Sequence, residues 1–268
     1  MVARHIMVWA TRLAESHPFA WKIAWEAVHH LPFLLPHDKS YHALRHFIKA
    51  AGPRGLFLDI GANDGISVLS FRKFDKEYRI LSLEPNSMLE PALKKIKASD
   101  PYFEYKMIGA GSRPERLCFF VPIYHGIILH TFTATRREQV KGAVAACFGK
   151  CVAAACFIQS IESEIVRVDD LNVNPTIVKI DAEGFDYEVL RGLDATLART
   201  RPFMIIEVAW AEKDTIAQYL DDREYALLAY DHETDRFSRD SDAYRSGHSG
   251  HRNSFAIPKE KLHCLPVD

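Results

Sequence analysis

The sequence lacks an excess of charge of either sign and a cysteine pattern that would crosslink it. Lysine and arginine together number 34, against 35 aspartates and glutamates, for a formal net charge of −1. We therefore expect no basic surface for nucleic acid or for an anionic membrane. The five cysteines are odd in number and fit neither a disulfide framework nor a zinc site, so we interpret them as reduced thiols of a cytoplasmic protein.

Long apolar runs are also missing. The most apolar later window, residues 142–158, contains Lys150 and is shorter than the roughly 20 residues that cross a bilayer. Near the N-terminus, Thr11, Arg12 and Glu15 interrupt the apolar residues before a signal-peptide core could form. We expect neither a transmembrane segment nor secretion.

The most informative stretch is an apolar segment that ends in an acid and turns through two glycines. Residues 55–59 have the composition of a buried strand, and a helix is predicted from Ile66 to Phe74. Between them, Asp59, Gly61 and Gly65 are spaced Asp-x-Gly-x-x-x-Gly. This spacing lacks the third glycine of the dinucleotide fingerprint, which disfavours an NAD-dependent oxidoreductase. It favours S-adenosylmethionine as the cofactor.

A second strand supports a cofactor site. The segment Arg79–Leu83 is apolar and is followed by Glu84, Pro85 and Asn86. A carboxylate at the end of this strand could accept hydrogen bonds from both hydroxyls of a ribose. Acids and glycines also occur at strand ends for capping and turns without a ligand, but the two signals together favour a cofactor.

Strands and helices alternate along most of the chain, which predicts an α/β fold with a doubly wound, mostly parallel sheet. An antiparallel pair, residues 225–230 and 254–258, should close it, with a long loop from 231 to 252 between the two strands. The other predicted strands are 55–59, 80–84, 103–108, 117–123, 164–168, 176–181 and 203–208, and the later helices are 185–193 and 213–220.

The chain divides into an N-terminal helical extension, residues 1–50, and a main domain, residues 51–268. Within the domain we expect a helical insert at about 122–163, formed by a loop from 125 to 135 and a helix from 136 to 156. In the extension, Trp21 and Trp25 form an aromatic stripe at helical spacing. This stripe should pack on the main domain; a contact between copies of the chain or with a membrane surface is the alternative.

A set of ordered motifs resembles the FkbM family of S-adenosylmethionine-dependent methyltransferases over roughly residues 56–208. The most specific motif is Lys179-Ile180-Asp181-Ala182-Glu183-Gly184, followed by Val189-Leu190-Arg191-Gly192. The other motifs are L-D-I-G-A-N-D-G, S-L-E-P-N, M-I-G-A-G, V-D-D-L and R-P-F-M-I-I-E-V. The resemblance implies a Rossmann-like class I methyltransferase that methylates hydroxyl oxygens on sugars or other metabolites. Asp186 stands where many relatives have Glu.

Cofactor residues are expected at the tips of consecutive strands. Asp59 should organise the first loop, whose backbone should face the methionine end of the cofactor. Glu84 should hold the ribose, and a turn at residues 109–111 should meet the adenine, although a purely structural turn is equally consistent. The complete set of expected cofactor contacts is Asp59, Gly61, Ala62, Asn63, Asp64, Gly65, Glu84, Pro85, Asn86, Ala110, Gly111 and Asp181.

Transfer of a methyl group to a hydroxyl requires an aligned acceptor and a base for its proton. Asp181 is the first candidate to contact the acceptor or the methionine amine. Glu183 is the next, with capping of the following helix as its other role. His130 and His125, in the insert, have a pKa suited to a base. Glu207 could reach the acceptor or pair with a cation.

Two alternatives to O-methylation stay open: methylation of nitrogen, and a binding module without turnover. The sequence offers no Asp-Asn ligand pair after the predicted strand 176–181, so we expect a site without metal. The acceptor should be a small molecule or a saccharide.

Overall fold

The computed structural model describes residues 39–182, 184–208, 212–239 and 253–268. The predicted tryptophan stripe and Glu183 lie outside these ranges. The described chain forms two compact units, one comprising residues 37–116 and 163–268 and the other containing residues 117–162. Each unit is considered by itself.

The larger unit is built on an eight-stranded sheet with the order β11-β10-β12-β9-β8-β1-β2-β3. Pairing is parallel from β3 to β9, and β12 runs antiparallel to both β9 and β10. The predicted doubly wound sheet and its antiparallel closing pair are confirmed. The strands are β1 (Leu56–Ile60), β2 (Arg79–Leu83), β3 (Phe103–Lys106), β8 (Ile177–Ile180), β9 (Phe203–Glu207), β10 (Tyr225–Asp231), β11 (Arg236–Ser238) and β12 (Asn253–Pro258).

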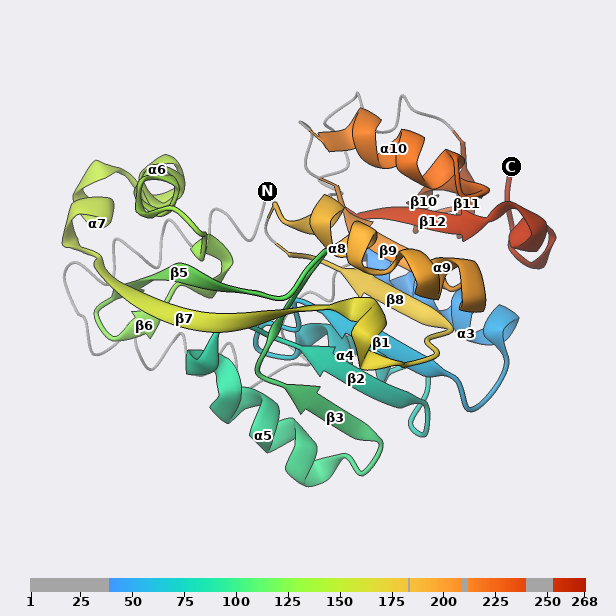
Figure 1. Cartoon of the computed structure of the whole chain (residues 1–268), viewed down its shortest axis with the longest axis horizontal. Coiled ribbons are helices and arrows are strands. Elements are labelled where there is room, and N and C mark those ends of the chain that lie inside the picture. The colour runs from blue at the N-terminus through green and yellow to red at the C-terminus, as the bar shows by residue number, and fades with distance from the viewer. Residues whose placement is uncertain (1–38, 183, 209–211, 240–252) are drawn as a thin grey trace. The chain divides into compact units, whose positions relative to one another are not determined.

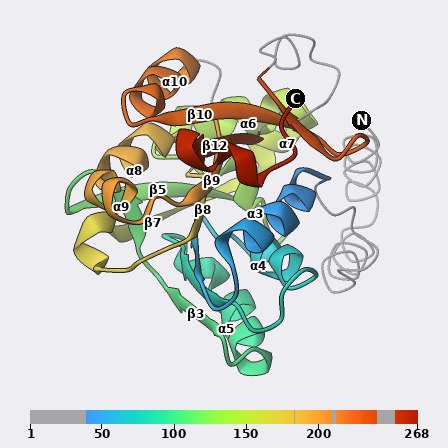
Figure 2. The ribbon, with the colours of Figure 1, turned by 90° about the vertical axis from the view of Figure 1, so that its right-hand side faces the viewer.

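Helices cover both faces of this sheet (Figures 1 and 2). On one face, Phe47 of α3, Phe71 of α4 and Leu93 of α5 belong to one buried cluster. On the other, Leu190 of α8 and Leu220 of α10 belong to a second cluster. The helices are α3 (Leu44–Ala51), α4 (Ile66–Phe71), α5 (Glu90–Ser99), α8 (Asp186–Gly192), α9 (Asp194–Thr200) and α10 (Lys213–Asp221), with 3-10 turns η1 (Lys39–Ala43), η2 (Ser87–Leu89), η4 (Val168–Leu171) and η6 (Lys259–Cys264).

The central strands are buried on both faces, as parallel strands between two helical layers are expected to be. Every residue of β1 and of β8 is buried, including the charged Asp59 and Lys179. The chain adds β2 and β3 on one side of β1, and later β8 and β9 on its other side. The order therefore reverses at β1 and β8, and ligands of open α/β sheets bind beyond the carboxyl ends of strands at such a point.

A second sheet has the order β4-β7-β5-β6. Its first strand, β4 (Gly109–Gly111), is the segment that we expected to be a turn; instead it pairs in parallel with β7 (Phe157–Arg167). The prediction was wrong because Gly-Ala-Gly has no side-chain pattern to indicate a strand, and its partner is distant in sequence. The predicted loop 231–252 also contains a strand in its described part, β11, which pairs with β10.

The unit that contains residues 117–162 has a small core of its own. Tyr124, Leu129 and Val140 lie buried in it together with Val144 and Val152. The single helix predicted here is two helices, because Gly149 adopts φ +94° between them. The predicted loop 125–135 likewise contains a short strand and a 3-10 turn. The elements are β5 (Glu115–Tyr124), β6 (Ile127–Ile128), η3 (His130–Phe132), α6 (Arg137–Phe148) and α7 (Lys150–Ala155).

Replacing Phe47 with alanine should strongly destabilise the larger unit. Its fully buried ring stacks on Phe203 at 5.0 Å and on Phe237 at 5.8 Å, so Phe47→Ala removes contacts between α3 and the sheet. We expect the free energy of unfolding to fall by about 3–5 kcal/mol in urea titrations. The control is Phe157→Ala, whose side chain is exposed and should cost well under about 1 kcal/mol. Equal losses would contradict this account of the core.

Candidate functional site

The carboxyl ends of four neighbouring strands bring the predicted residues together. Ile60 of β1 is level with Leu83 of β2 and with Ile180 of β8, which is in turn level with Ile206 of β9. The next residue along each strand therefore lies at the same edge of the sheet. These residues are Gly61, Glu84, Asp181 and Glu207, and the edge that they define is called the strand-end edge below.

The loop after β1 is shaped by positions that admit little but glycine. The amides of Gly61 and Ala62 donate to the Leu83 carbonyl at 2.9 and 3.2 Å. Gly61 has φ +76°, and a Cβ there would lie 1.8 Å from the Asp181 carbonyl oxygen. At Gly65, with φ +90°, a Cβ would lie 2.2 Å from Ile96. The backbone of β1 can therefore turn directly beside the end of β8.

Asp59 supports this loop from beneath. Its side chain is fully buried, and Oδ2 accepts hydrogen bonds from the hydroxyls of Ser67 and Ser82, each at 2.8 Å. Ser67 belongs to α4 and Ser82 to β2, so one carboxylate oxygen ties β1 to the helix that follows it and to the neighbouring strand. Asp59 thus has the contacts expected of a residue that organises the loop, and its contact with a cofactor stays a prediction.

Our sequence analysis named Lys179 only as part of a family motif and assigned it no role in the site. It lies opposite Asp59 in the parallel pairing of β8 with β1, and only 2% of it is exposed. Its ammonium group donates to the Gly61 carbonyl at 3.1 Å and lies 3.2 Å from Asp181 Oδ2 and 3.7 Å from Asp59 Oδ1. The ammonium group therefore has three oxygen neighbours, two of them within hydrogen-bond distance. A lysine in a fully buried strand, level with a buried aspartate, is the signal that could have revealed it.

The electrostatics of this cluster favour the charged lysine. Burial by itself lowers the pKa of Lys179, but the carboxylates of Asp181 and Asp59 outweigh it and raise the pKa above its ordinary value. The ammonium therefore persists, and it compensates the negative charge of Asp59 in the interior.

Glu84 holds the loop from the end of β2. Its Oε2 accepts from the amide of Asn63 at 2.7 Å and its Oε1 from the amide of Asn86 at 2.8 Å. Burial raises the pKa of this carboxyl to about 7, against the effect of the two amides. Each oxygen has a second lone pair, so these bonds leave acceptor capacity for a ligand.

Two asparagines beside Glu84 have buried polar atoms without partners. Within the described ranges, Asn63 Oδ1 and Asn86 Nδ2 make no hydrogen bond. The other side-chain atom of Asn86, Oδ1, accepts from the Met88 amide at 3.1 Å and caps η2. Because buried polar atoms are rarely left unpaired, this acceptor and this donor are suited to a polar ligand at the strand-end edge.

The loop after β8 is closed by Asp186. Its carboxylate accepts from the amides of Ala182 at 2.8 Å and of Gly184 at 3.2 Å, and burial raises its pKa to about 6. The sequence analysis noted Asp186 only as a departure from the family pattern, but it shapes the loop that begins at Asp181. Glu183 lies outside the described residues, so its role stays a prediction.

The remaining predicted residues fall into two groups. A Cβ on Gly109 would be 3.4 Å from Pro85 Cβ, so β4 lies near the end of β2. Ala110 of β4 is buried in the apolar cluster of the larger sheet. His125 and His130 belong to the unit that contains residues 117–162, where His125 adopts φ +49° and His130 opens η3. Their proximity to an acceptor therefore stays a prediction.

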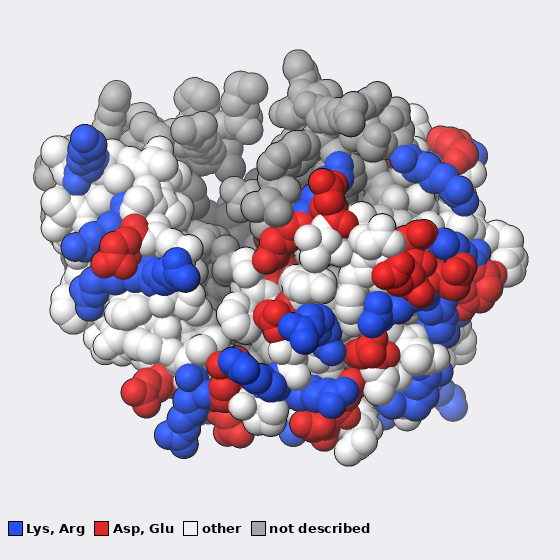
Figure 3. Space-filling model, turned by 45° about the horizontal axis from the view of Figure 1, so that its top comes forward, with Lys and Arg blue, Asp and Glu red and all other residues white. Residues whose placement is uncertain are grey.

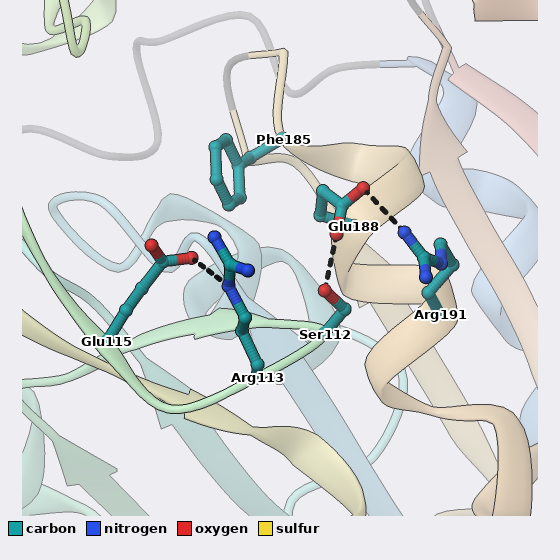
Figure 4. Close-up of a pocket in the computed structure, with 6 residues that line it drawn as sticks. All are labelled: Ser112, Arg113, Glu115, Phe185, Glu188 and Arg191. Atoms are coloured by element: carbon teal, nitrogen blue, oxygen red, sulfur yellow. Dashed lines mark hydrogen bonds and ion pairs between the residues drawn. The ribbon is translucent and has the colours of Figure 1, made fainter.

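A hollow of about 480 Å³ lies beside α8 in the larger unit (Figure 4). Its walls come from the segment after β4 and from the start and outer side of α8. The residues that line it are Ser112, Arg113, Glu115, Phe185, Glu188 and Arg191. The Phe185 amide donates to the Ala182 carbonyl at 3.1 Å, so one wall of the hollow lies close to the residue that follows Asp181.

The sequence profile of the methyltransferase FkbM domain matches residues 59–227, more than half of the chain. The chain belongs to the FkbM methyltransferase family. This is a family of methyltransferases that generally use S-adenosylmethionine. No curated protein matches the chain significantly.

Solved structures similar to this chain include proteins described as methyltransferases. Methyltransferase FkbM from Methylobacillus flagellatus KT aligns with a TM-score of 0.48 at 13% identity, over 93% of this chain and 60% of its own. Precorrin-6y C5,15-methyltransferase from Geobacter metallireducens GS-15 has a TM-score of 0.42 at 14% identity, over 83% and 87%. An rRNA methylase from Streptococcus thermophilus has a TM-score of 0.43 at 9% identity, over 81% and 93%.

Three further observations concern the described residues alone. No described helix is long and apolar enough to cross a membrane. No three His, Cys, Asp or Glu side chains in the described ranges are grouped so that they could hold a metal ion. On the face shown in Figure 3, basic and acidic side chains are interspersed.

Replacing Lys179 with methionine should destabilise the protein by about 3–5 kcal/mol, because it leaves the buried Asp59 without a compensating charge. Urea titration would measure the loss. In the double variant Lys179→Met, Asp59→Asn we expect part of this loss to be recovered, since the isolated negative charge is gone. The control is Lys106→Met, at an exposed position at the end of β3. A loss at Lys179 no larger than at Lys106 would show that the ammonium is not a structural charge.

Proposed function

We propose that the chain binds S-adenosylmethionine at the strand-end edge and transfers its methyl group to a hydroxyl oxygen of a saccharide or a secondary metabolite. The observation that carries the cofactor proposal is the arrangement around Glu84. A buried carboxylate with spare acceptor capacity binds the amides of Asn63, in the glycine loop, and of Asn86, and each of these asparagines has a buried side-chain atom that makes no hydrogen bond within the described chain.

The residues present fit the chemistry of this cofactor. The ribose of S-adenosylmethionine carries two hydroxyl donors, and the Glu84 carboxylate has lone pairs to accept from them. The amide of Asn86 could donate to a ring nitrogen of adenine, and the carbonyl of Asn63 could accept from an ammonium group. The loop 61–65 offers backbone groups to the methionine end. When bound, the cofactor supplies a methyl group on a positively charged sulfur.

Asp181 is suited to the acceptor side. It extends from the same edge, its side chain is 29% exposed, and Lys179 holds one of its oxygens at 3.2 Å. Its carboxylate can accept a hydrogen bond from a hydroxyl and orient the oxygen for in-line attack. An alcohol is a weak acid and needs such help, whereas an amine acceptor needs less. Glu207, one strand further, and His130 are the other candidates for the base.

Removing the Glu84 carboxylate should weaken cofactor binding. Glu84→Ala deletes the acceptor for the ribose hydroxyls and the anchor of the Asn63 and Asn86 amides. We expect the Kd of S-adenosylhomocysteine to rise by about 10- to 150-fold, corresponding to about 1.5–3 kcal/mol for hydrogen bonds to a charged group. Calorimetry measures this change, with Glu104→Ala, an exposed site on β3, as the matched control. Unchanged affinity in folded Glu84→Ala protein would rule out this role.

Cofactor affinity should also increase with pH. The pKa of Glu84 in the folded protein is about 7, above its ordinary value of 4.5, so the ligand-free fold favours the protonated carboxyl. The stability that this preference contributes is complete below about pH 4.5 and is lost as the pH rises through 7. Ribose hydroxyls donate to the ionised form. S-adenosylhomocysteine should therefore bind about tenfold more tightly at pH 8 than at pH 6. Glu84→Ala should lack this dependence; a flat profile in the unaltered protein would contradict the assignment.

Transfer of a labelled methyl group from S-adenosylmethionine tests the reaction itself. The acceptors would be offered in matched pairs that carry either a hydroxyl or an amine at the same position. We expect label on the hydroxyl compound, and Asp181→Asn should lower turnover by about 10²-fold or more while the cofactor Kd changes little. His130→Ala should lower turnover in the same way if it is the base. Label on the amine alone would replace the proposal with N-methylation, and cofactor binding without transfer to any acceptor would favour a binding module.

A further inference from the structure

The hollow beside α8 has a fixed frame. A Cβ on Gly192 of α8 would lie 1.9 Å from the Gly111 carbonyl oxygen, so α8 and β4 are in direct backbone contact. A Cβ on Gly111 itself would lie 3.6 Å from the ring of Phe185. Asp186, bonded to the amides of Ala182 and Gly184, fixes the loop that carries this ring. The backbone segments that carry the lining residues are therefore held together by the fold.

The charges that line the hollow are balanced. Arg113 lies 3.6 Å from Glu115, and Arg191 donates to Glu188 at 3.2 Å. Ser112 also donates to Glu188 (Figure 4). Two guanidinium groups and two carboxylates give a formal sum of zero. An anionic ligand would meet two carboxylates, and a cationic one would meet two guanidinium groups, so neither sign is favoured.

Hydroxyl groups fit this lining best. A hydroxyl donates to a carboxylate and accepts from a guanidinium at the same time, so it can join either ion pair without leaving a charge unpaired. Neighbouring hydroxyls on a ring match the paired atoms of these planar groups. Phe185 adds an apolar ring against which the C–H side of such a ligand can lie. In Figure 4 the guanidinium of Arg113 points toward the ring of Phe185.

We propose that this hollow is a specificity subsite, lined by Arg113, Glu115, Phe185, Glu188 and Arg191, for an uncharged ring that carries several hydroxyl groups. The inference rests on the proposed function, since the occupant is a part of the methyl acceptor. The Phe185 amide donates to the Ala182 carbonyl at 3.1 Å, so this wall of the hollow lies beside the residue that follows Asp181. The subsite selects neutral glycosides over phosphorylated, uronic or amino sugars.

Ligand-observed NMR on the full chain with saturating S-adenosylhomocysteine tests the subsite. The probes are methyl β-glucoside and methyl β-galactoside as neutral rings, methyl β-glucuronide as an anionic ring and glucosamine as a cationic one. We expect millimolar binding of at least one neutral glycoside and about tenfold weaker binding of the charged rings. Glu188→Gln and Phe185→Leu should each weaken the neutral glycoside about tenfold, as expected for loss of a charge-assisted bond or of the aromatic contact. Glu104→Gln, at an exposed ion pair on β3, should leave it unchanged.

The results separate the subsite from the proposed function. Cofactor affinity, measured in the same variants, establishes that they are folded, and Phe185→Leu tests the site even if Glu188→Gln does not fold. The inference is overturned by a lack of binding of both neutral glycosides, by binding that neither variant weakens, or by tighter binding of a charged ring. If S-adenosylhomocysteine itself does not bind, the proposed function fails, and the same titration without it still decides whether the hollow binds glycosides.

Discussion

The geometry of the strand-end edge depends on one buried charge, the ammonium group of Lys179. Its three oxygen neighbours come from Asp59 near the end of β1, from Gly61 in the loop after β1 and from Asp181 directly after β8. An apolar side chain of the same length could fill the space, and a buried ion pair is weak evidence for stability. What an apolar residue could not do is fix the Gly61 carbonyl and the Asp181 carboxylate relative to each other. We infer that the lysine specifies the geometry of the site.

The acidic residues around this charge differ in burial and in the role that we assign to each. Asp59 is fully buried and is occupied by Ser67, Ser82 and Lys179, so it supports the loop from below. Glu84 is bonded to two loop amides and keeps acceptor capacity. Asp181, at the end of the next strand, is partly exposed and faces the acceptor side in our proposal. Carboxylates with different surroundings thus support different steps, which is how a site separates structural from chemical roles.

The sequence predicted the central sheet well, because β1, β2, β8 and β9 are apolar runs that end in an acid or a glycine. It also predicted the antiparallel pair of β10 and β12. It did not predict β4, whose Gly-Ala-Gly pairs with residues far along the chain, or the break at Gly149. The sequence also did not predict the hollow, because its two walls are separated by about 70 residues of sequence. The walls meet because Gly192 lets α8 contact β4.

The measurement that tests the account most directly is isothermal titration calorimetry of the full chain with S-adenosylmethionine and S-adenosylhomocysteine, with NAD as the control. The account predicts a Kd on the order of micromolar for both adenosyl ligands and no measurable binding of NAD, because the glycine loop lacks the third glycine that admits a pyrophosphate. Absence of binding by either adenosyl ligand, in protein shown to be folded, would contradict the claim that the strand-end edge is a cofactor site.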